Sequence, residues 1–262
     1  MRLSVRAELD YGFAAPTDLL LQIEAAAIPE QIVEDSSLLL PPCAHVARVA
    51  AQDDIGERIW IRAEGRFLAT YQATVTIQRL LADIATLPSV PPHMLPGETV
   101  AYLMPSRFCP SDRFRTFVDA EFGGLEGGAL AAAMRDWIAG HFSYVPGSSQ
   151  SDTTAQDSFV SRQGICRDYA HTLITFARAA AIPARYASVY APGVEPPDFH
   201  AVAELFLGGA WHLVDATGMA EPGAMAKIGV GRDAADVAIL TAYGCAEMRA
   251  QTVTVEALGG AA

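Results

Sequence analysis

The first hundred residues alternate between apolar and polar side chains over short stretches, which is the pattern of strands that bury one face. The alternation occurs in Arg2–Tyr11, Leu19–Ala25, Ile59–Ile61 and Tyr71–Ile77, with Gly, Pro and Asp between the stretches. Short strands at regular spacing are typical of an antiparallel β-sandwich or an open barrel. Between two of these stretches, we expect Arg62–Arg66 to form a turn.

The pattern changes after the proline-rich segment Pro88–Pro96, which cannot belong to a central strand, and changes again near Pro105. Beyond that point, Leu130–His141 and Cys166–Ala181 carry apolar residues at helical spacing. Three extended segments follow, Ala184–Tyr190, Phe199–Leu207 and Trp211–Asp215. Helices followed by antiparallel strands predict an α+β fold, with a β-rich domain over residues 1–104 and a second domain over residues 105–262.

The charge of the chain argues against a nucleic-acid partner. It has 18 Lys and Arg against 30 Asp and Glu, a net charge of −12, whereas nucleic-acid binding needs clustered basic residues. No stretch approaches the ~20 apolar residues that span a bilayer, and Arg6, Glu8 and Asp10 stand where a signal peptide would be apolar. We therefore expect a cytoplasmic protein without nucleic-acid or membrane contacts, and the sequence predicts no oligomeric state.

The four cysteines are Cys43, Cys109, Cys166 and Cys245, and they form no CxxC pair, so we expect free thiols. Cys166 stands at the start of a predicted helix, shortly after Gly164. A thiol there faces unpaired backbone N–H groups and the positive end of the helix dipole, which favour the thiolate. His171 lies about 140° around the same helix, so we expect it to pack rather than to act as a base.

A histidine and an aspartate on neighbouring strands complete a catalytic arrangement. A two-residue turn at Gly208-Gly209 pairs Leu207 with Ala210. In this register, His200 and Asp215 are diagonal neighbours on one face, about 7–8 Å apart before their side chains reach toward each other. The carboxylate orients the histidine and stabilises its imidazolium, which in turn stabilises a thiolate. These residue types are also common in structural roles, so spacing alone leaves both interpretations open.

Four fragments together resemble the transglutaminase-like superfamily. They are Gly164-Ile165-Cys166-Arg167-Asp168-Tyr169-Ala170-His171, Ile182-Pro183-Ala184-Arg185-Tyr186, Asp198-Phe199-His200-Ala201 and Trp211-His212-Leu213-Val214-Asp215-Ala216-Thr217. The resemblance covers roughly residues 144–217 and is to bacterial members that look like cysteine proteases with an N-terminal β domain. It implies a papain/transglutaminase-like core, in which the helix bearing Cys166 packs on an antiparallel sheet bearing His200 and Asp215, preceded by an antiparallel β-sandwich-like domain.

By this resemblance, Cys166 is the nucleophile, His200 the general base and acid, and Asp215 the orienting carboxylate. The implied function is a cysteine-dependent amide or peptide hydrolase or acyltransferase that forms a thioester acyl-enzyme. A protein or peptide amide is the expected substrate, with no cofactor and no metal. Family members commonly carry Trp soon after the histidine and Pro after the aspartate, whereas this chain has Ala201-Val202 and Ala216. These departures bear on the substrate rather than on the triad.

Two side chains are candidates for stabilising an oxyanion. Tyr144 precedes the loop that leads to Cys166, and Gln163 lies close before it; a partly buried tyrosine and a solvent-facing glutamine are the structural alternatives. The backbone N–H of Cys166 is a donor that needs no side chain. For Asp168 we expect a structural role, as a cap of the helix or a partner of Arg185.

Two alternatives to an active enzyme remain open. One is a binding or scaffold module that keeps the fold with a weak or silent site. The other is a thiolate metal site built from Cys166, His200 and Asp215, although the long spacings lack the short ligand pairs of typical zinc sites.

Overall fold

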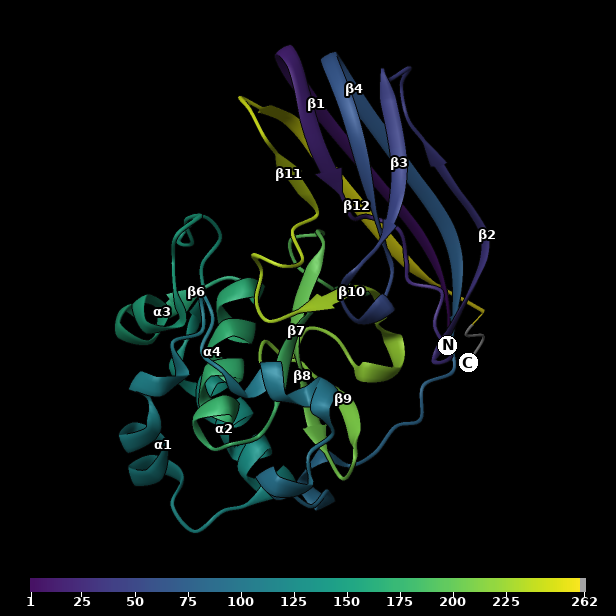
Figure 1. Cartoon of the computed structure of the whole chain (residues 1–262). Coiled ribbons are helices and arrows are strands. Elements are labelled where there is room, and N and C mark those ends of the chain that lie inside the picture. The colour runs from purple at the N-terminus through teal and green to yellow at the C-terminus, as the bar shows by residue number, and fades with distance from the viewer. Residues whose placement is uncertain (260–262) are drawn as a thin grey trace.

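Two antiparallel sheets organise the chain, as seen in a computed structural model that describes residues 1–259. In Figure 1, a strand-rich layer lies at the upper right, and a unit of helices around a smaller sheet lies at the lower left. This arrangement confirms the predicted α+β class.

Six strands form the first sheet: β1 (Arg2–Leu21), β2 (Gln31–Leu39), β3 (His45–Ala50), β4 (Glu57–Ile77), β11 (Leu240–Ala242) and β12 (Glu247–Leu258). The long strands β1 and β4 pair along most of their length. Each also has two further partners, β12 and β11 on β1, and β2 and β3 on β4. Alternate residues of β1 and β4 are buried, as their apolar pattern predicted, in one hydrophobic core.

The predicted turn at Arg62–Arg66 is wrong, because β4 continues without a break through these residues. Gly65 pairs with Phe13 and Ala63 with Thr17, so β1 bulges between these two pairs. Gly65 has a φ of +73°, which glycine adopts without strain. The chain therefore bends within a long strand instead of reversing direction.

The end of the chain returns to the first sheet. Strands β11 and β12 belong to the segment predicted as catalytic, residues 105–262, yet both pair with β1. Leu3 faces Ala257, and Leu19 faces Ala242. The domain boundary near residue 104 stays a prediction. Strand pairing, however, places residues 240–258 in the strand-rich layer.

Within residues 1–259, the second unit contains four α-helices, namely α1 (Arg115–Phe122), α2 (Gly127–His141), α3 (Ala155–Ser161) and α4 (Cys166–Ala179). Its sheet has the order β10-β7-β8-β9, with β7 (Ala184–Tyr190), β8 (His200–Leu207), β9 (Ala210–Val214) and β10 (Ala226–Gly231). The short strands β5 (Ser143–Tyr144) and β6 (Gln163–Gly164) pair in parallel. Short 3₁₀ helices are η1 (Gln52–Asp54), η2 (Ile84–Thr86), η3 (Pro92–Met94), η4 (Gly97–Leu103), η5 (Ser111–Arg113) and η6 (Pro222–Ala224).

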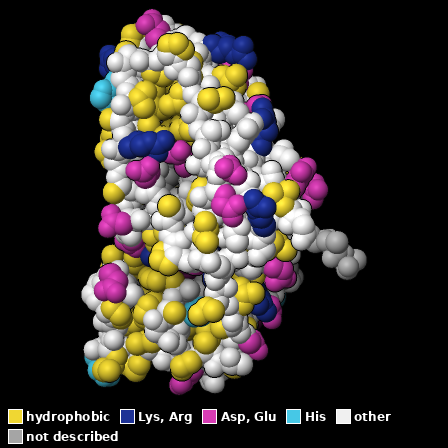
Figure 2. All heavy atoms as spheres, turned by 90° about the vertical axis from the view of Figure 1, so that its right-hand side faces the viewer, with side chains coloured by type: hydrophobic (Ala, Val, Ile, Leu, Met, Phe, Trp, Pro, Cys, Tyr) yellow, Lys and Arg dark blue, Asp and Glu magenta, His cyan; other side chains and the backbone are white. Residues whose placement is uncertain are grey.

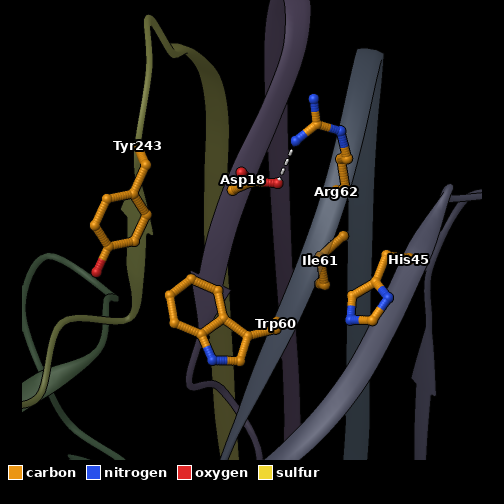
Figure 3. A pocket seen from close by; sticks show the side chains of 6 residues that line it. All are labelled: Asp18, His45, Trp60, Ile61, Arg62 and Tyr243. Carbon is orange, nitrogen blue, oxygen red and sulfur yellow. Dashed lines mark hydrogen bonds and ion pairs between the residues drawn. The ribbon is translucent and has the colours of Figure 1, made fainter.

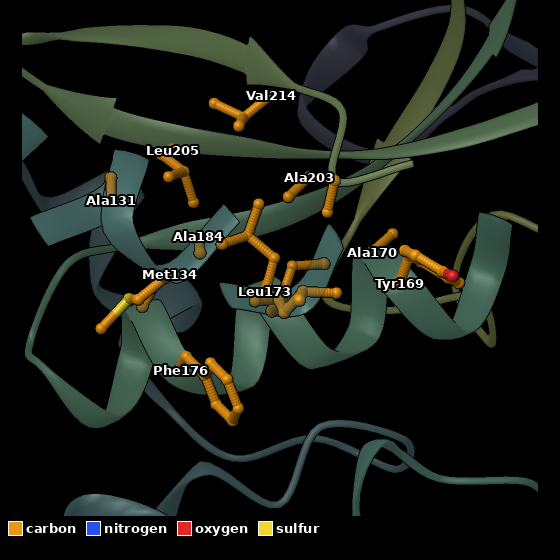
Figure 4. Packing of buried hydrophobic residues seen from close by; sticks show 14 of the residues in the cluster. Ala131, Met134, Tyr169, Ala170, Leu173, Phe176, Ala184, Ala203, Leu205 and Val214 are labelled. Carbon is orange, nitrogen blue, oxygen red and sulfur yellow. The ribbon is translucent and has the colours of Figure 1, made fainter. Parts of the chain in front are cut away.

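Helix α4 is the centre of this unit. Its apolar side chains, among them Leu173 and Phe176, are fully buried against Ala203 and Leu205 of β8 and against α2 (Figure 4). The helix begins at the predicted residue and ends at Ala179, two residues before the predicted end. No helix within residues 1–259 is long and apolar enough to cross a membrane.

Charged groups are dispersed over the face shown in Figure 2, where the basic side chains do not gather into one continuous patch. A cluster of charged side chains lies between the two sheets. Glu204 of β8 binds Arg185 of β7 at 2.6 Å and also binds Lys227 of β10, the one lysine of the chain. Arg185 further binds Asp53 at 2.8 Å, and Lys227 binds Glu30. These pairs tie the second sheet to the N-terminal half.

We expect Lys227→Met to lower the free energy of unfolding by about 3 kcal/mol, because it removes one of the two cations that compensate the buried Glu204 carboxylate. The matched control is Arg62→Met, which breaks an ion pair with Asp18 whose side chains are 49% and 53% exposed; its expected loss is below about 1 kcal/mol. Urea denaturation followed by circular dichroism measures both. Equal losses would show that the buried pairs contribute no more than a surface pair.

Candidate active site

Cys166 is the first residue of α4 and is 9% exposed. The start of the helix is held by Asp168, whose carboxylate accepts the Ile165 N–H at 2.8 Å and the Ser149 hydroxyl at 2.9 Å. A Cβ at Gly164 would lie 2.6 Å from the Asp168 Cβ, so this close approach requires glycine. The thiol therefore stands where the first backbone N–H groups of the helix are free. Asp168 acts as the predicted cap.

His200 is the first residue of β8, and its Nε2 lies 2.9 Å from Oδ2 of Asp215, directly after β9. The predicted register is confirmed, since Leu207 pairs with Ala210 across the Gly208-Gly209 turn. Both glycines have a positive φ, +60° and +86°, as a tight two-residue hairpin requires. His200 is 1% and Asp215 8% exposed, so the pair is shielded from water.

Asp215 is held by more than His200. Its carboxylate accepts the Thr217 N–H and hydroxyl, at 2.8 and 2.7 Å, and the N–H groups of Met219 and Ala220, at 3.1 and 3.0 Å. Burial by itself would raise the pKa of Asp215, but His200 and Thr217 hold it below its usual value. Asp215 is therefore ionised at neutral pH. These supports were not predicted from the sequence, although Thr217 belongs to the motif that contains Asp215.

The environment of His200 favours its charged form. Burial alone would lower its pKa, but the hydrogen bond to Asp215 and the hydrogen bonding and charge of Cys166 outweigh this and raise it to about 9. Its other ring nitrogen, Nδ1, is buried and has no nitrogen or oxygen partner within residues 1–259. The structure thus brings Cys166, His200 and Asp215 together, and the arrangement can hold a thiolate beside an imidazolium.

Of the two oxyanion candidates, the structure brings Tyr144 to the thiol. Tyr144 pairs with Gly164 through the β5–β6 contact. Burial, together with the neighbouring charge of Cys166, raises the pKa of Tyr144 to about 12. Its hydroxyl keeps its proton at neutral pH and can donate it in a hydrogen bond. Gln163 is exposed, and its side chain makes no hydrogen bond in the described part of the chain.

His171 packs, as predicted. It is fully buried, with its ring centre 5.2 Å from that of Phe108 and 5.3 Å from that of Tyr186. Its Nε2 accepts the Ala234 N–H at 3.1 Å. Burial, aided by nearby arginines, lowers its pKa well below the usual value, so the ring is neutral. It cannot serve as the charged partner of Cys166.

The other three cysteines lack this setting, and all four are free thiols. Burial raises the pKa of Cys109 to about 12 and also raises that of Cys43. Cys245 is exposed. Residues 1–259 contain no group of three or more His, Cys, Asp or Glu arranged to hold a metal ion.

A separate open pocket of about 620 Å³ lies on the first sheet (Figure 3). It is lined by Asp18, His45, Trp60, Ile61, Arg62 and Tyr243. The Trp60 and Tyr243 rings lie beside each other, with centres 5.6 Å apart. None of the triad residues lines this pocket.

Comparison with known proteins places the same residues in a family. The model of the transglutaminase-like superfamily matches residues 123–216, a range that contains Cys166, His200 and Asp215. A crystal structure from Cytophaga hutchinsonii, described as a putative cysteine protease, is 33% identical and has a TM-score of 0.94. That match covers 100% of this chain and 92% of the other.

Two further matches are more limited. An uncharacterised protein of Mycobacterium leprae is 31% identical over 121 residues, 43% of each chain, so the match spans less than half of that relative. The periplasmic domain of TgpA from Pseudomonas aeruginosa is 19% identical over 82% of this chain and 77% of that one, with a TM-score of 0.42.

The full-length match at 33% identity shows the same fold, and the range that the family model matches contains Cys166, His200 and Asp215. The chain therefore belongs to the transglutaminase-like superfamily, a family of cysteine-dependent hydrolases and transferases.

Proposed function

We propose that this protein is a thiol-dependent amide hydrolase or acyltransferase whose substrate is a peptide or isopeptide. One observation supports this above the others: Cys166 at a helix N-terminus neighbours a histidine that Asp215 binds at 2.9 Å and whose pKa is raised to about 9. A buried ion pair of thiolate and imidazolium is the resting state that a cysteine nucleophile needs.

In the first half of the proposed reaction, the Cys166 thiolate attacks the amide carbonyl carbon. The carbonyl oxygen becomes an oxyanion, which accepts hydrogen bonds from the Cys166 N–H and the Tyr144 hydroxyl. The His200 imidazolium gives its proton to the amine nitrogen, and the C–N bond breaks. The amine leaves, and the acyl group stays on Sγ as a thioester.

In the second half, neutral His200 takes a proton from water or from an incoming amine, which attacks the thioester carbon. The C–S bond breaks, giving an acid or a new amide and restoring the ion pair. We favour hydrolysis, with water as the group that attacks the thioester. The chemistry of these residues requires neither metal nor cofactor.

The four free thiols suit a reducing compartment, and we propose the cytoplasm as the location. No observation favours the alternative of a silent module. The experiments below would support that alternative if the wild-type protein is inactive.

We expect Cys166→Ala and His200→Ala to abolish turnover. Asp215→Asn should keep a small part of the activity, lowered by up to about 10⁴-fold, because the aspartate orients the histidine and does not itself transfer a proton. Mass spectrometry of a peptide mixture, incubated with and without an added primary amine, detects both acid and amide products. Wild-type rates in His200→Ala would show that the base is assigned wrongly. An inactive wild-type protein would support the silent module.

Asp215→Asn should also change the pH profile. The raised pKa of His200 means that the imidazolium is present below about pH 9, so kcat/KM should fall as pH rises through that value. Asp215 is one cause of the raised pKa, and its loss should move this alkaline limb to lower pH. An unmoved limb would mean that another group titrates.

Tyr144→Phe should lower kcat by about a hundredfold with a smaller effect on KM, since the hydrogen bond forms in the transition state. Gln163→Ala tests the other oxyanion candidate and should lower kcat much less, because Gln163 is exposed. Steady-state kinetics on one cleaved peptide gives both values. A larger loss in Gln163→Ala would reverse the assignment.

Iodoacetamide at pH 6 should label Cys166 well ahead of Cys43, Cys109 and Cys245. A thiol with an ordinary pKa near 8.5 is only about 0.3% ionised at that pH, and burial raises the pKa of Cys43 and Cys109 further. Peptide mapping by mass spectrometry measures the four rates. His200→Ala should remove most of the advantage, and equal labelling in the native protein would contradict an activated thiol.

A further inference from the structure

Asp198 lies two residues before His200, in the segment that joins β7 to β8, and its side chain is exposed. One carboxylate oxygen, Oδ1, accepts the Phe199 N–H at 2.7 Å and the Nε2 amide of Gln251 at 2.6 Å. Gln251 belongs to β12 of the first sheet. The other oxygen, Oδ2, has no hydrogen bond within residues 1–259, and no basic residue there forms an ion pair with Asp198. The carboxylate is therefore held in place by neutral donors while its charge is left unpaired.

The neighbouring residue anchors this segment more firmly. Phe199 packs against the core of the first sheet, with its ring centre 5.5 Å from that of Tyr190. Phe199 and the Gln251 contact together fix the chain directly before His200. The position of Asp198 relative to the catalytic histidine is thus set by the first sheet.

The chain limits how far Asp198 can lie from the proposed catalytic histidine. Two residues of extended chain span about 7 Å, which limits its distance from the His200 backbone. The negative charge of Asp198 also affects two tyrosines. Burial is the main cause of the raised pKa values of Tyr144 and Tyr11, and the charge of Asp198 raises both further. Tyr144 neighbours Cys166, and Tyr11 is on β1. The charge of Asp198 therefore acts both on Tyr144, which neighbours Cys166, and on Tyr11 of the first sheet.

The chemistry indicates which part of a substrate meets Asp198. In the proposed reaction, on which this inference rests, His200 protonates the leaving amine. The amine side of the amide must then lie toward His200, and the residues just before His200 border that side. An unpaired carboxylate there attracts a cation and repels an anion.

We propose that Asp198 forms an anionic subsite that selects substrates with a positive charge on the amine side of the reacting amide. For a peptide, this means a basic residue after the bond that is cleaved. Gln251, through its hydrogen bond, is a positioning residue for the subsite.

Charged thiol reagents test the subsite without knowledge of the substrate. The rate of modification of Cys166 is measured for the cation 2-aminoethyl methanethiosulfonate and the anion 2-sulfonatoethyl methanethiosulfonate. Asp198→Asn should lower the cation-to-anion rate ratio by about three- to tenfold, and 1 M salt should shrink this difference. Asparagine keeps a carbonyl oxygen for the Gln251 hydrogen bond. Asp119→Asn, the same charge change on α1, is the control and should leave the ratio nearly unchanged.

The outcomes separate this inference from the proposed function. If Cys166 reacts readily but Asp198→Asn does not change the ratio, or changes it no more than Asp119→Asn, the subsite is overturned while the activated thiol stands. If wild-type Cys166 reacts no faster than an ordinary thiol, the proposed function fails and the subsite falls with it.

A second measurement concerns products. Among peptides cleaved by the wild-type protein, Arg or Lys should be enriched directly after the cleaved bond. Asp198→Asn should reduce this enrichment by about three- to tenfold, matching the reagent ratio. Cleavage without such enrichment, or with enrichment that survives Asp198→Asn, would overturn the subsite.

Discussion

The buried carboxylate of Glu204 constrains both halves of the molecule. Removing a carboxylate from water is costly unless cations replace the lost hydration, and here Arg185 and Lys227 do so. Burial by itself would raise the pKa of Glu204, but these two cations hold it below its usual value. Because Arg185 also binds Asp53 and Lys227 also binds Glu30, the five charges are satisfied together only when β7, β8 and β10 lie against the N-terminal half.

The strand that carries Glu204 also begins with His200, so this constraint reaches the site. The charge network holds β8 at Glu204, in the middle of the strand, while Phe199 in the core of the first sheet and the Asp198–Gln251 hydrogen bond fix the chain just before β8. The first sheet is therefore part of the support of the histidine rather than a separate attachment. Asp215, directly after β9, is held by the backbone N–H groups of Met219 and Ala220. These hydrogen bonds leave the His200–Asp215 contact little freedom.

Several features could be predicted because they depend on short stretches of chain. The helix from Cys166 follows from apolar spacing, and the pairing of Leu207 with Ala210 follows from the two glycines between them. That register was enough to bring His200 and Asp215 to one face. The predicted turn at Arg62–Arg66 was wrong for a related reason, since local polarity resembles a turn whether the chain reverses or bends within a long strand.

The sequence by itself determined the strand and helix pattern, the hairpin register and, through combined motifs, the family and the three candidate catalytic residues. Only the tertiary structure decided which partners lie across long separations: β12 on β1, Lys227 between Glu204 and Glu30, and Gln251 on Asp198. Periodicity reports which face of an element is buried but not which element covers it. Partners far apart in the chain are chosen by the packing and charge pairing of the whole fold, and no local pattern records that choice.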